Sequence, residues 1–276
     1  MLGLLLGGAL GLPAWAQVPS WAVVTGMVWQ DNVTNAERPS DLIGAWQWHT
    51  ALSTEIAHAG AGGHRWRSSA GVRTEVWPRF EGLNLVAPGV AGAWEYKPGV
   101  GPYRPVFSAD GETEWIAAQE AARAGWAGAL RLRMRQRLGA AWEFSAGHEW
   151  RRLDAHGMAF DRTGREWFGR LEYVPVRDWI LALEAAERVG DVVSYSQPPR
   201  PDLVAIGKPI TFVDTFEQSS PWIAYYFRAR TRSGAVEVMR RFGRATLTLR
   251  YEFRDTVHAG PGYRNRLTAV RYAVPF

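Results

Sequence analysis

The residues of this sequence that could do chemistry are carboxylates and arginines placed at every second position. The clearest acidic row is Asp110, Glu112 and Glu114, and the clearest basic row is Arg131, Arg133 and Arg135. Carboxylates with this spacing could bind Ca²⁺ if another segment supplied more oxygen ligands. A simpler explanation is that two adjacent strands place opposite charges side by side. We therefore expect no metal and no cofactor.

The histidines offer no good catalytic group. His49 shares a strand face with Ser53 and Glu55, but those residues lie about 13 and 20 Å away along an extended chain, too far for direct proton transfer. The chain has no cysteine, which excludes disulfides, thiolate zinc sites and cysteine nucleophiles. We predict that the protein is not an enzyme. A hydrolase that uses His49 or Ser53 is the least favoured alternative.

Long alternating runs must position the charged rows. Residues 245–254 read ATLTLRYEFR, with apolar groups on one face and polar or charged groups on the other, and similar runs fill most of the chain. This period of two indicates strands. Several runs exceed the roughly 9–11 residues that a tilted transmembrane strand needs. Arginine and glutamate at every second position would be too costly in a dry core but suit a wet lumen.

The fold class predicted from this pattern is all-β: a single closed antiparallel transmembrane β-barrel with twelve strands. The predicted strands are about 20–31, 42–57, 64–78, 85–96, 103–117, 126–136, 141–153, 165–174, 179–195, 221–242, 245–257 and 265–276. Short turns alternate with longer loops, as in outer-membrane barrels, where turns face the periplasm and loops the exterior. Fourteen strands is the alternative, if Thr211–Glu217 pairs and Ser233-Gly234 forms a turn.

The two ends of the chain predict its compartment. Residues 1–16 hold a short apolar run and end in Ala14-Trp15-Ala16, which predicts a cleaved secretory signal peptide and a barrel domain over 17–276. The chain closes on alternating apolar residues and a terminal aromatic: Val270, Tyr272, Val274 and Phe276. This ending resembles the β-signal that the barrel assembly machinery recognises in bacterial outer-membrane proteins, although Pro275 departs from the usual pattern.

Three further segments resemble a group of uncharacterised proteobacterial outer-membrane barrels. They are residues 31–36 (DNVTNA), 79–84 (RFEGLN) and 190–194 (GDVVS), each at a junction between a strand and a loop. The resemblance implies the outer membrane of a Gram-negative bacterium and no known activity. Asn, Asp and Gly favour turns, so we expect these segments to cap strands and order loops.

The expected role follows from the residues that face the lumen. The candidates are Arg65, Arg67, Arg73, Glu75, Asp110, Glu112, Glu114, Arg131, Arg133, Arg135, Glu149, Arg151, Arg250, Glu252 and Arg254. Such a lumen favours a passive, porin-like channel for small solutes, anions among them. A structural or surface-interaction barrel with a charge-plugged lumen is the alternative. The expected partners are the lipid bilayer and the barrel assembly machinery. Nucleic acid is excluded because arginine and tryptophan occupy opposite strand faces.

Overall fold

A computed structural model describes residues 19–197, 199–216, 222–258 and 262–276, so the predicted signal peptide lies outside the described residues. The strands are β1 Ser20–Gln30, β2 Ala45–Ala59, β3 His64–Val76, β4 Leu85–Tyr96, β5 Val106–Ala118, β6 Gly125–Arg137, β7 Trp142–Ala155, β8 Arg162–Val176, β9 Trp179–Ser196, β10 Ile210–Val213, β11 Trp222–Phe242, β12 Ala245–Val257 and β13 Gly262–Pro275. The helical turns are η1 Pro39–Asp41, η2 Ala61–Gly63, η3 Glu81–Leu83, η4 Ala121–Arg123, η5 Met158–Phe160 and α1 Pro201–Val204. Within the described residues, no helix has the length and apolar character needed to cross a membrane.

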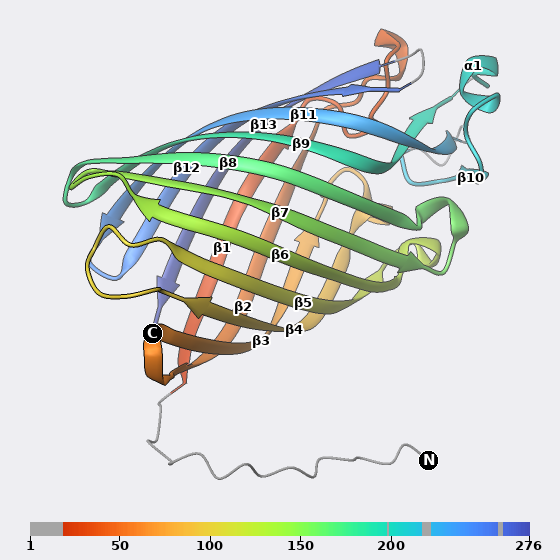
Figure 1. The fold of residues 1–276 in the computed structure, drawn as a ribbon. Coiled ribbons are helices and arrows are strands. Elements are labelled where there is room, and N and C mark those ends of the chain that lie inside the picture. Colours follow the sequence, from red (N-terminus) through yellow and green to blue (C-terminus); the bar gives the residue numbers. More distant parts are fainter. Residues whose placement is uncertain (1–18, 198, 217–221, 259–261) are drawn as a thin grey trace, which may run out of the picture.

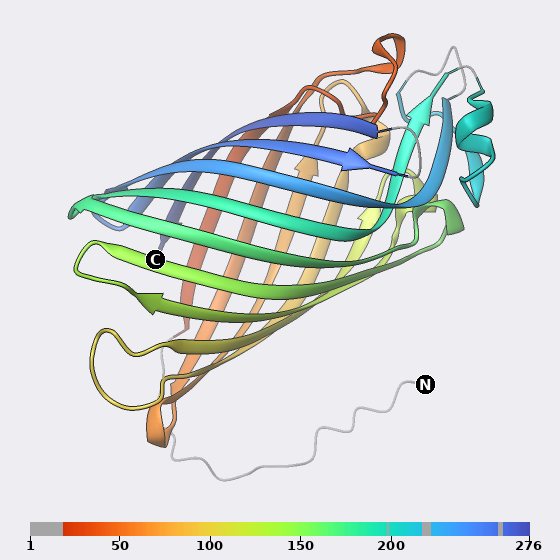
Figure 2. The same cartoon turned by 45° about the horizontal axis from the view of Figure 1, so that its top comes forward.

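Twelve of these strands form a closed antiparallel barrel (Figure 1). Strand β1 pairs with both β2 and β13, and β11 pairs with both β9 and β12, so the ring has no gap. The short strand β10 pairs with β11 outside the ring, at the end where β9 and β11 extend beyond their neighbours (Figure 2). The predicted fold class and the count of twelve are confirmed.

The fourteen-strand alternative is wrong, although one half of its premise is correct. Thr211 does pair, opposite Ala224, but in β10 outside the ring. Ser233 and Gly234 form no turn and lie inside β11, in register with β9 on one side and β12 on the other. A turn there would break backbone hydrogen bonds on both sides at once, which the local preference of a Ser-Gly pair cannot outweigh.

The connections sort into two ends of the barrel. The end with short turns, here the turn end, holds residues 60–63, 97–105, 138–141, 177–178 and 243–244, and β13 finishes there (Figure 1). The opposite end, here the loop end, carries the connections 31–44, 77–84, 119–124, 156–161, 197–221 and 258–261, which are longer on average, although 97–105 at the turn end exceeds four of them. By the rule for bacterial barrels, the turn end faces the periplasm and the loop end faces the exterior.

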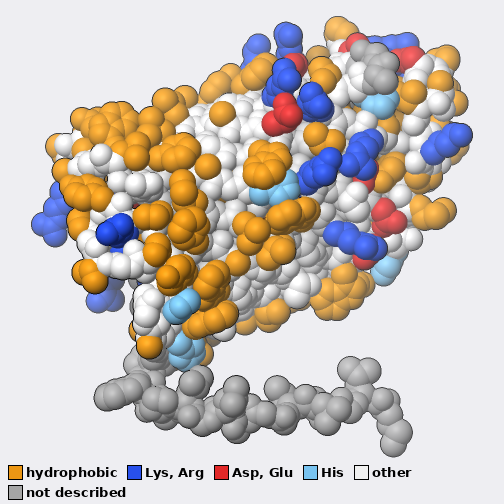
Figure 3. All heavy atoms as spheres, viewed as in Figure 1, with side chains coloured by type: hydrophobic (Ala, Val, Ile, Leu, Met, Phe, Trp, Pro, Cys, Tyr) orange, Lys and Arg blue, Asp and Glu red, His pale blue; other side chains and the backbone are white. Residues whose placement is uncertain are grey.

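An apolar belt surrounds the barrel (Figure 3). It includes the exposed side chains of Leu52, Val90, Leu130, Leu132, Leu183, Val236, Leu249 and Val270. Aromatic pairs flank it, with Trp142 stacked on Tyr173 toward the turn end and Trp29 tilted against Trp46 toward the loop end. A closed ring satisfies its own backbone hydrogen bonds, as a lipid environment requires. The belt and the ring together place the protein in the outer membrane of a Gram-negative bacterium.

The last strand seals the barrel against β1. Its alternating residues are in register as Val270 with Met27, Tyr272 with Thr25 and Val274 with Val23. The backbone N–H of Phe276 donates to the carbonyl of Trp21 at 2.8 Å. The terminal segment is therefore part of the closing seam, and its recognition by the assembly machinery stays a prediction.

Candidate functional site

The inner face of the barrel carries charged residues that alternate with the apolar belt. Asp110, Arg131 and Glu149 are directly opposed on β5, β6 and β7 and so share this face, whereas Trp150 belongs to the outer set. The register places all the sequence-predicted lumen residues on the inner face, namely Arg65, Arg67, Arg73, Glu75, Asp110, Glu112, Glu114, Arg131, Arg133, Arg135, Glu149, Arg151, Arg250, Glu252 and Arg254.

Arg67 on β3 is the centre of a first group of ion pairs. Its guanidinium lies 3.5 Å from the carboxylate of Glu55 on β2, 3.3 Å from Glu95 on β4 and 3.6 Å from Asp110 on β5. All four side chains are partly exposed to the lumen. Pairs of this kind contribute only about 0–1 kcal/mol each to stability. They therefore determine the charge of the wall more than the strength of the fold.

The sequence predicts that the acidic row on β5 pairs with the basic row on β6, and this prediction is wrong. Its ion pairs run to β3 instead: Asp110 with Arg67, and Glu114 with Arg73 at 2.7 Å. Asp110 is the register partner of Arg131, but Arg131 contacts Glu149 on β7. The side chain of Glu149 is only 1% exposed, and a buried carboxylate costs far more to leave unpaired than an exposed one.

A second group of ion pairs joins β8, β9, β11 and β12. Arg170 lies 3.3 Å from Glu184 and 2.6 Å from Glu237. Arg250 contacts the same two carboxylates at 2.9 and 3.5 Å and also reaches Glu252 at 3.0 Å. Two arginines thus share two glutamates on neighbouring strands, and little of their charge is free to act on a solute.

These lumen ion pairs follow the wall of the barrel. Among the described residues, each pair joins side chains on the same strand, on adjacent strands or on strands one apart in the ring. The described lumen therefore contains no ion pair that bridges opposite walls and blocks the axis.

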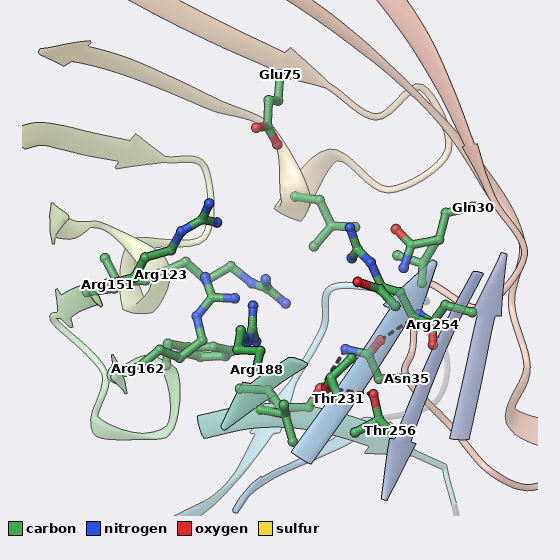
Figure 4. Close-up of a pocket in the computed structure, with 18 of the residues that line it drawn as sticks. Gln30, Asn35, Glu75, Arg123, Arg151, Arg162, Arg188, Thr231, Arg254 and Thr256 are labelled. Atoms are coloured by element: carbon green, nitrogen blue, oxygen red, sulfur yellow. Dashed lines mark hydrogen bonds between the residues drawn. The ribbon is translucent and has the colours of Figure 1, made fainter. Parts of the chain in front are cut away.

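A cavity of 540 Å³, here the chamber, lies inside the barrel toward the loop end (Figure 4). Seven arginines and four glutamates are among the residues that line it. The arginines are Arg123, Arg131, Arg151, Arg162, Arg188, Arg250 and Arg254, and the glutamates are Glu75, Glu166, Glu184 and Glu252. The chamber therefore carries a surplus of positive charge.

The surplus is concentrated on one wall. Figure 4 shows Arg123, Arg151, Arg162 and Arg188 gathered on one side, with Glu75 across the chamber. Within the described residues, Arg162 and Arg188 make no ion pair, whereas most other chamber arginines do. No described carboxylate lies within ion-pair distance of either guanidinium group, although Glu166 on β8 is the register partner of Arg188.

Two glycines create space beside these arginines. Gly164 on β8 is in register with Gly190 on β9 and with Arg151 on β7. A Cβ on Gly190 would lie 2.5 Å from the carbonyl oxygen of Thr163, so the strands approach too closely for a side chain there. The inner wall between the arginine side chains is accordingly bare backbone.

An apolar patch borders the arginine wall. Leu153 on β7 packs with Ile116 and Ala87, and Leu85 packs against the same group. Leu85, Ile116 and Leu153 line the chamber. Leu153 is the direct register partner of Arg162, so apolar and cationic surfaces meet along one edge.

A group of buried aromatic residues, here the cap, lies at the loop end. Its members come from several connections and from the extended ends of β9 and β11: Phe80, Phe160, Tyr195, Phe216 and Trp222. Phe216 is the common contact, with ring centroids 5.3 Å from Phe80, 5.0 Å from Tyr195 and 5.2 Å from Trp222. Phe160, Tyr195 and Phe216 also line the chamber, so the cap borders it on the exterior side.

Arg123 links the cap to the connection between β5 and β6. Its guanidinium donates to the hydroxyl of Tyr195 at 2.6 Å and lies over the ring of Phe160 at 4.7 Å. The hydroxyl of Thr215 donates to Glu120 at 2.6 Å and holds the segment before Phe216 to the same connection.

Hydrogen bonds join the first and third segments of the sequence resemblance. The side-chain amide of Asn32 donates to the carbonyl of Ala36 at 2.8 Å, and its oxygen accepts from the N–H of Ala36. The amide of Asn35 donates to the carbonyl of Val193 at 2.9 Å, and the hydroxyl of Ser194 donates to the carbonyl of Asn35. The expectation that these segments order the loops is confirmed.

The second segment acts within its own loop. The side-chain oxygen of Asn84 accepts from the backbone N–H of Trp77 at 2.7 Å, and Phe80 contributes its ring to the cap. All three segments therefore meet around the mouth of the barrel.

Two smaller cavities continue along the lumen. One of 250 Å³ lies against β2–β7 and is lined by residues of both charge signs, including Arg67, Asp110, Glu112, Arg133 and Glu149. The other, of 310 Å³, lies at the turn end, where its charged lining is Lys97, Arg104, Arg135, Arg137 and Glu143. Positive charge is in surplus in the cavities near both ends, whereas the middle cavity has four carboxylates against three arginines.

The inner histidine sits in a packed environment. His49 faces Gly26, where an added Cβ would lie 2.6 Å from the imidazole Cε1. The described part of the chain holds no group of three or more His, Cys, Asp or Glu residues arranged to bind a metal ion.

Sequence reasoning missed Arg162, Arg188 and the cap. Arg162 was missed because the predicted strand 165–174 starts three residues after the true start of β8 at Arg162. Arg188 lies four residues after Glu184 on β9 and so faces the lumen as well. The alternation of the predicted strand therefore could have identified Arg188. The cap has no local signal, because its members are far apart in the sequence.

No family model matches the chain, and no curated protein matches it. An outer-membrane channel from Pseudomonas putida F1 aligns at 12% identity over 96% of this chain and 99% of that chain, with a TM-score of 0.56. The NanC porin aligns at 9% identity over 91% and 98%, with a TM-score of 0.48. The beta domain of the Bordetella autotransporter BrkA aligns at 14% identity over 94% and 100%, with a TM-score of 0.45. The likeness to the Pseudomonas channel shows a shared outer-membrane β-barrel fold.

Proposed function

We propose that the protein is a passive outer-membrane pore that prefers small anionic solutes. The observation that carries this proposal is the arginine wall of the chamber, where Arg162 and Arg188 have no carboxylate partner among the described residues. Unpaired cations along a wet path lower the energy of a passing anion and raise that of a cation. The ion pairs that follow the wall support an open axis.

The proposed path uses the remaining lumen residues in a supporting role. The arginines with partners, such as Arg67 and Arg250, are largely neutralised by their glutamates. The turn-end cavity, lined by Arg135 and Arg137, would attract anions at the other end of the path. On this proposal the lumen residues conduct and perform no catalysis.

Planar-bilayer recordings test this function. The wild-type protein should give discrete conductance steps. Under a KCl gradient, its reversal potential should shift from zero toward the equilibrium potential of chloride. The double variant Arg162→Gln/Arg188→Gln should keep the steps and lose much of the chloride preference. Arg165→Gln is the matched control, because Arg165 is exposed on the outer face of β8 and its loss should leave selectivity unchanged. A cation-selective wild type, or an unaltered double variant, contradicts the proposal.

One observation favours a second function. The cap brings connections from several sides of the mouth into contact, which suits a barrel whose lumen is closed and whose loops bind a surface partner. Such a protein would show no conductance steps in the same recordings. The bilayer experiment therefore separates the two functions.

The maturation of the chain is proposed on sequence grounds. Removal of residues 1–16 would release a mature protein that starts near Gln17, and the assembly machinery would recognise Val270, Tyr272, Val274 and Phe276. Membership of the uncharacterised proteobacterial barrel group is proposed on the same grounds. N-terminal sequencing of the membrane-extracted protein, and membrane yield after Phe276→Ala, test the first two points.

A further inference from the structure

We propose that the chamber binds a small organic anion with an apolar body, such as an aromatic carboxylate. This inference rests on the proposed function and names the solute class that its chamber selects. Three features of the wall carry it: unpaired arginines, an adjoining apolar patch and the aromatic edge of the cap.

The first feature is a site for the anionic group. Arg162 and Arg188 extend into the chamber beside Arg151 (Figure 4). Arg151 already contacts Glu149, whereas the other two make no ion pair in the described part of the chain. Guanidinium groups held close together repel one another, and a carboxylate between them relieves the repulsion and accepts charge-assisted hydrogen bonds. Gly164, the register partner of Arg151, adds no side chain to this part of the wall, and the stem of Arg188 passes beside it.

The second feature is an apolar surface beside that site. Leu153 is in register with Arg162 and packs with Ile116, and both residues line the chamber. Phe160 and Phe216 add aromatic surface from the cap. A chloride or phosphate ion could use the arginines but would gain nothing from these side chains. An aromatic or branched aliphatic body would bury its surface against them.

The third feature is the size of the space. The chamber measures 540 Å³, within the range of about 300–1,000 Å³ that small-molecule sites occupy, often in the mouths of β-barrels. Neutral polar groups, including those of Asn35, Thr231 and Thr256, continue the lining beyond Arg188, whose register partner on β11 is Thr231 (Figure 4). A ligand with one charged end and one apolar side fits this distribution better than a symmetrical dianion.

Calorimetric titration of the detergent-solubilised full chain tests the inference, with benzoate as the probe. Acetate supplies the same carboxylate without the ring, and benzyl alcohol supplies the ring without the charge. We expect benzoate to bind at least about tenfold more tightly than either, since the apolar contact and the ion pair each contribute on the order of a factor of ten. Equal binding of acetate and benzoate, or no binding of benzoate, overturns the inference.

Variants separate the two halves of the site. Arg162→Gln/Arg188→Gln should weaken benzoate binding about tenfold or more, and Leu153→Ala should weaken benzoate but leave acetate unchanged. Arg165→Gln, on the outer face, is the matched control and should bind benzoate as the wild type does. Unchanged migration of the folded barrel on unheated gels verifies that each variant folds. An unaltered double variant contradicts the proposed site.

Binding and conduction give distinguishable failures. A protein that conducts chloride but shows no preference for benzoate remains a pore, and only this inference fails. A protein that binds benzoate but gives no conductance steps has the site without the path, and then the proposed function fails.

Discussion

Leu153 on β7 and Arg162 on β8 are direct partners in the strand register and both line the chamber. An apolar side chain and an unpaired cation therefore stand next to each other on the inner face, near the mouth. In the middle of the lumen the inner face is different, because Asp110, Arg131 and Glu149 occupy successive strands there. The barrel thus changes along its axis from mixed charge with a slight excess of carboxylates to an amphipathic, cationic wall.

Glu149 should be the most important lumen carboxylate for stability. Its buried side chain contacts both Arg131 and Arg151, and Glu149→Gln removes the charge that holds two guanidinium groups together. We expect the free energy of unfolding in urea to fall by about 2 kcal/mol, typical of a lost charged hydrogen bond. Glu95→Gln is the control, because the pair of Glu95 with Arg67 is partly exposed and should cost less than about 1 kcal/mol. Equal losses in the two variants contradict this expectation.

The strand architecture is predictable from the sequence because its signal is local. The predicted strand 126–136 corresponds to Gly125–Arg137, and 64–78 corresponds to His64–Val76. Each strand separates lipid from water, so its own residues must alternate regardless of its partners. The same requirement places the charged residues of each strand on one face, as the strand register has them.

The partners of the charged residues and the shape of the mouth are not predictable in this way. Arg67 reaches past its neighbouring strand to Asp110, which strand order alone does not indicate. The cap assembles Phe80, Phe160 and Phe216 from three different connections. Contacts of this kind depend on how loops fold over the barrel, and no period in the sequence encodes them.

Gly190→Ala should destabilise the barrel through backbone contact. The new Cβ would lie 2.5 Å from the carbonyl oxygen of Thr163 and 2.6 Å from the Cα of Gly164, so the two strands must move apart. We expect a loss of about 1–3 kcal/mol in unfolding free energy, the usual cost of overpacking. Gly169→Ala, on β8, is the control, since nothing lies within 4 Å of its added Cβ. If both variants unfold like the wild type, the close approach at Gly190 is absent.

Asp202 holds the guanidinium of Arg200, which in turn contacts Glu37 on the connection 31–44, so protonation of Asp202 in strong acid should loosen this tether. Arg200 contacts Glu37 at 2.8 Å and also contacts Asp202. The hydrogen bond from Arg200 lowers the pKa of Asp202 from 3.8 to about 2. A lowered pKa in the folded state means that the contribution of this contact is complete above about pH 4 and is lost as the pH falls toward 2.

Spin labels can report this opening, because the chain has no cysteine of its own. The distribution of distances between labels at Ser40→Cys and Val204→Cys should broaden as the pH falls from about 4 toward 2. Arg200→Gln should broaden the distribution at every pH. A transition near pH 6 would contradict the assignment to Asp202.

Phe216→Ala should loosen the cap and widen the mouth. The ring of Phe216 contacts Phe80, Tyr195 and Trp222, so its loss removes the shared centre of the cluster. The removal of a buried phenylalanine costs about 3–5 kcal/mol, here as local rather than global stability. We expect larger single-channel conductance and faster proteolysis of the loop at 197–221.

Phe212→Ala is the matched control for the cap. Phe212 lies nearby on β10 but is 73% exposed and makes no ring contact with another described aromatic residue. Its removal should leave conductance and proteolysis unchanged. If Phe216→Ala conducts as the wild type does although its loop is cleaved faster, the cap orders the loops without limiting the path. The narrowest point for a solute then lies deeper in the lumen than the cap.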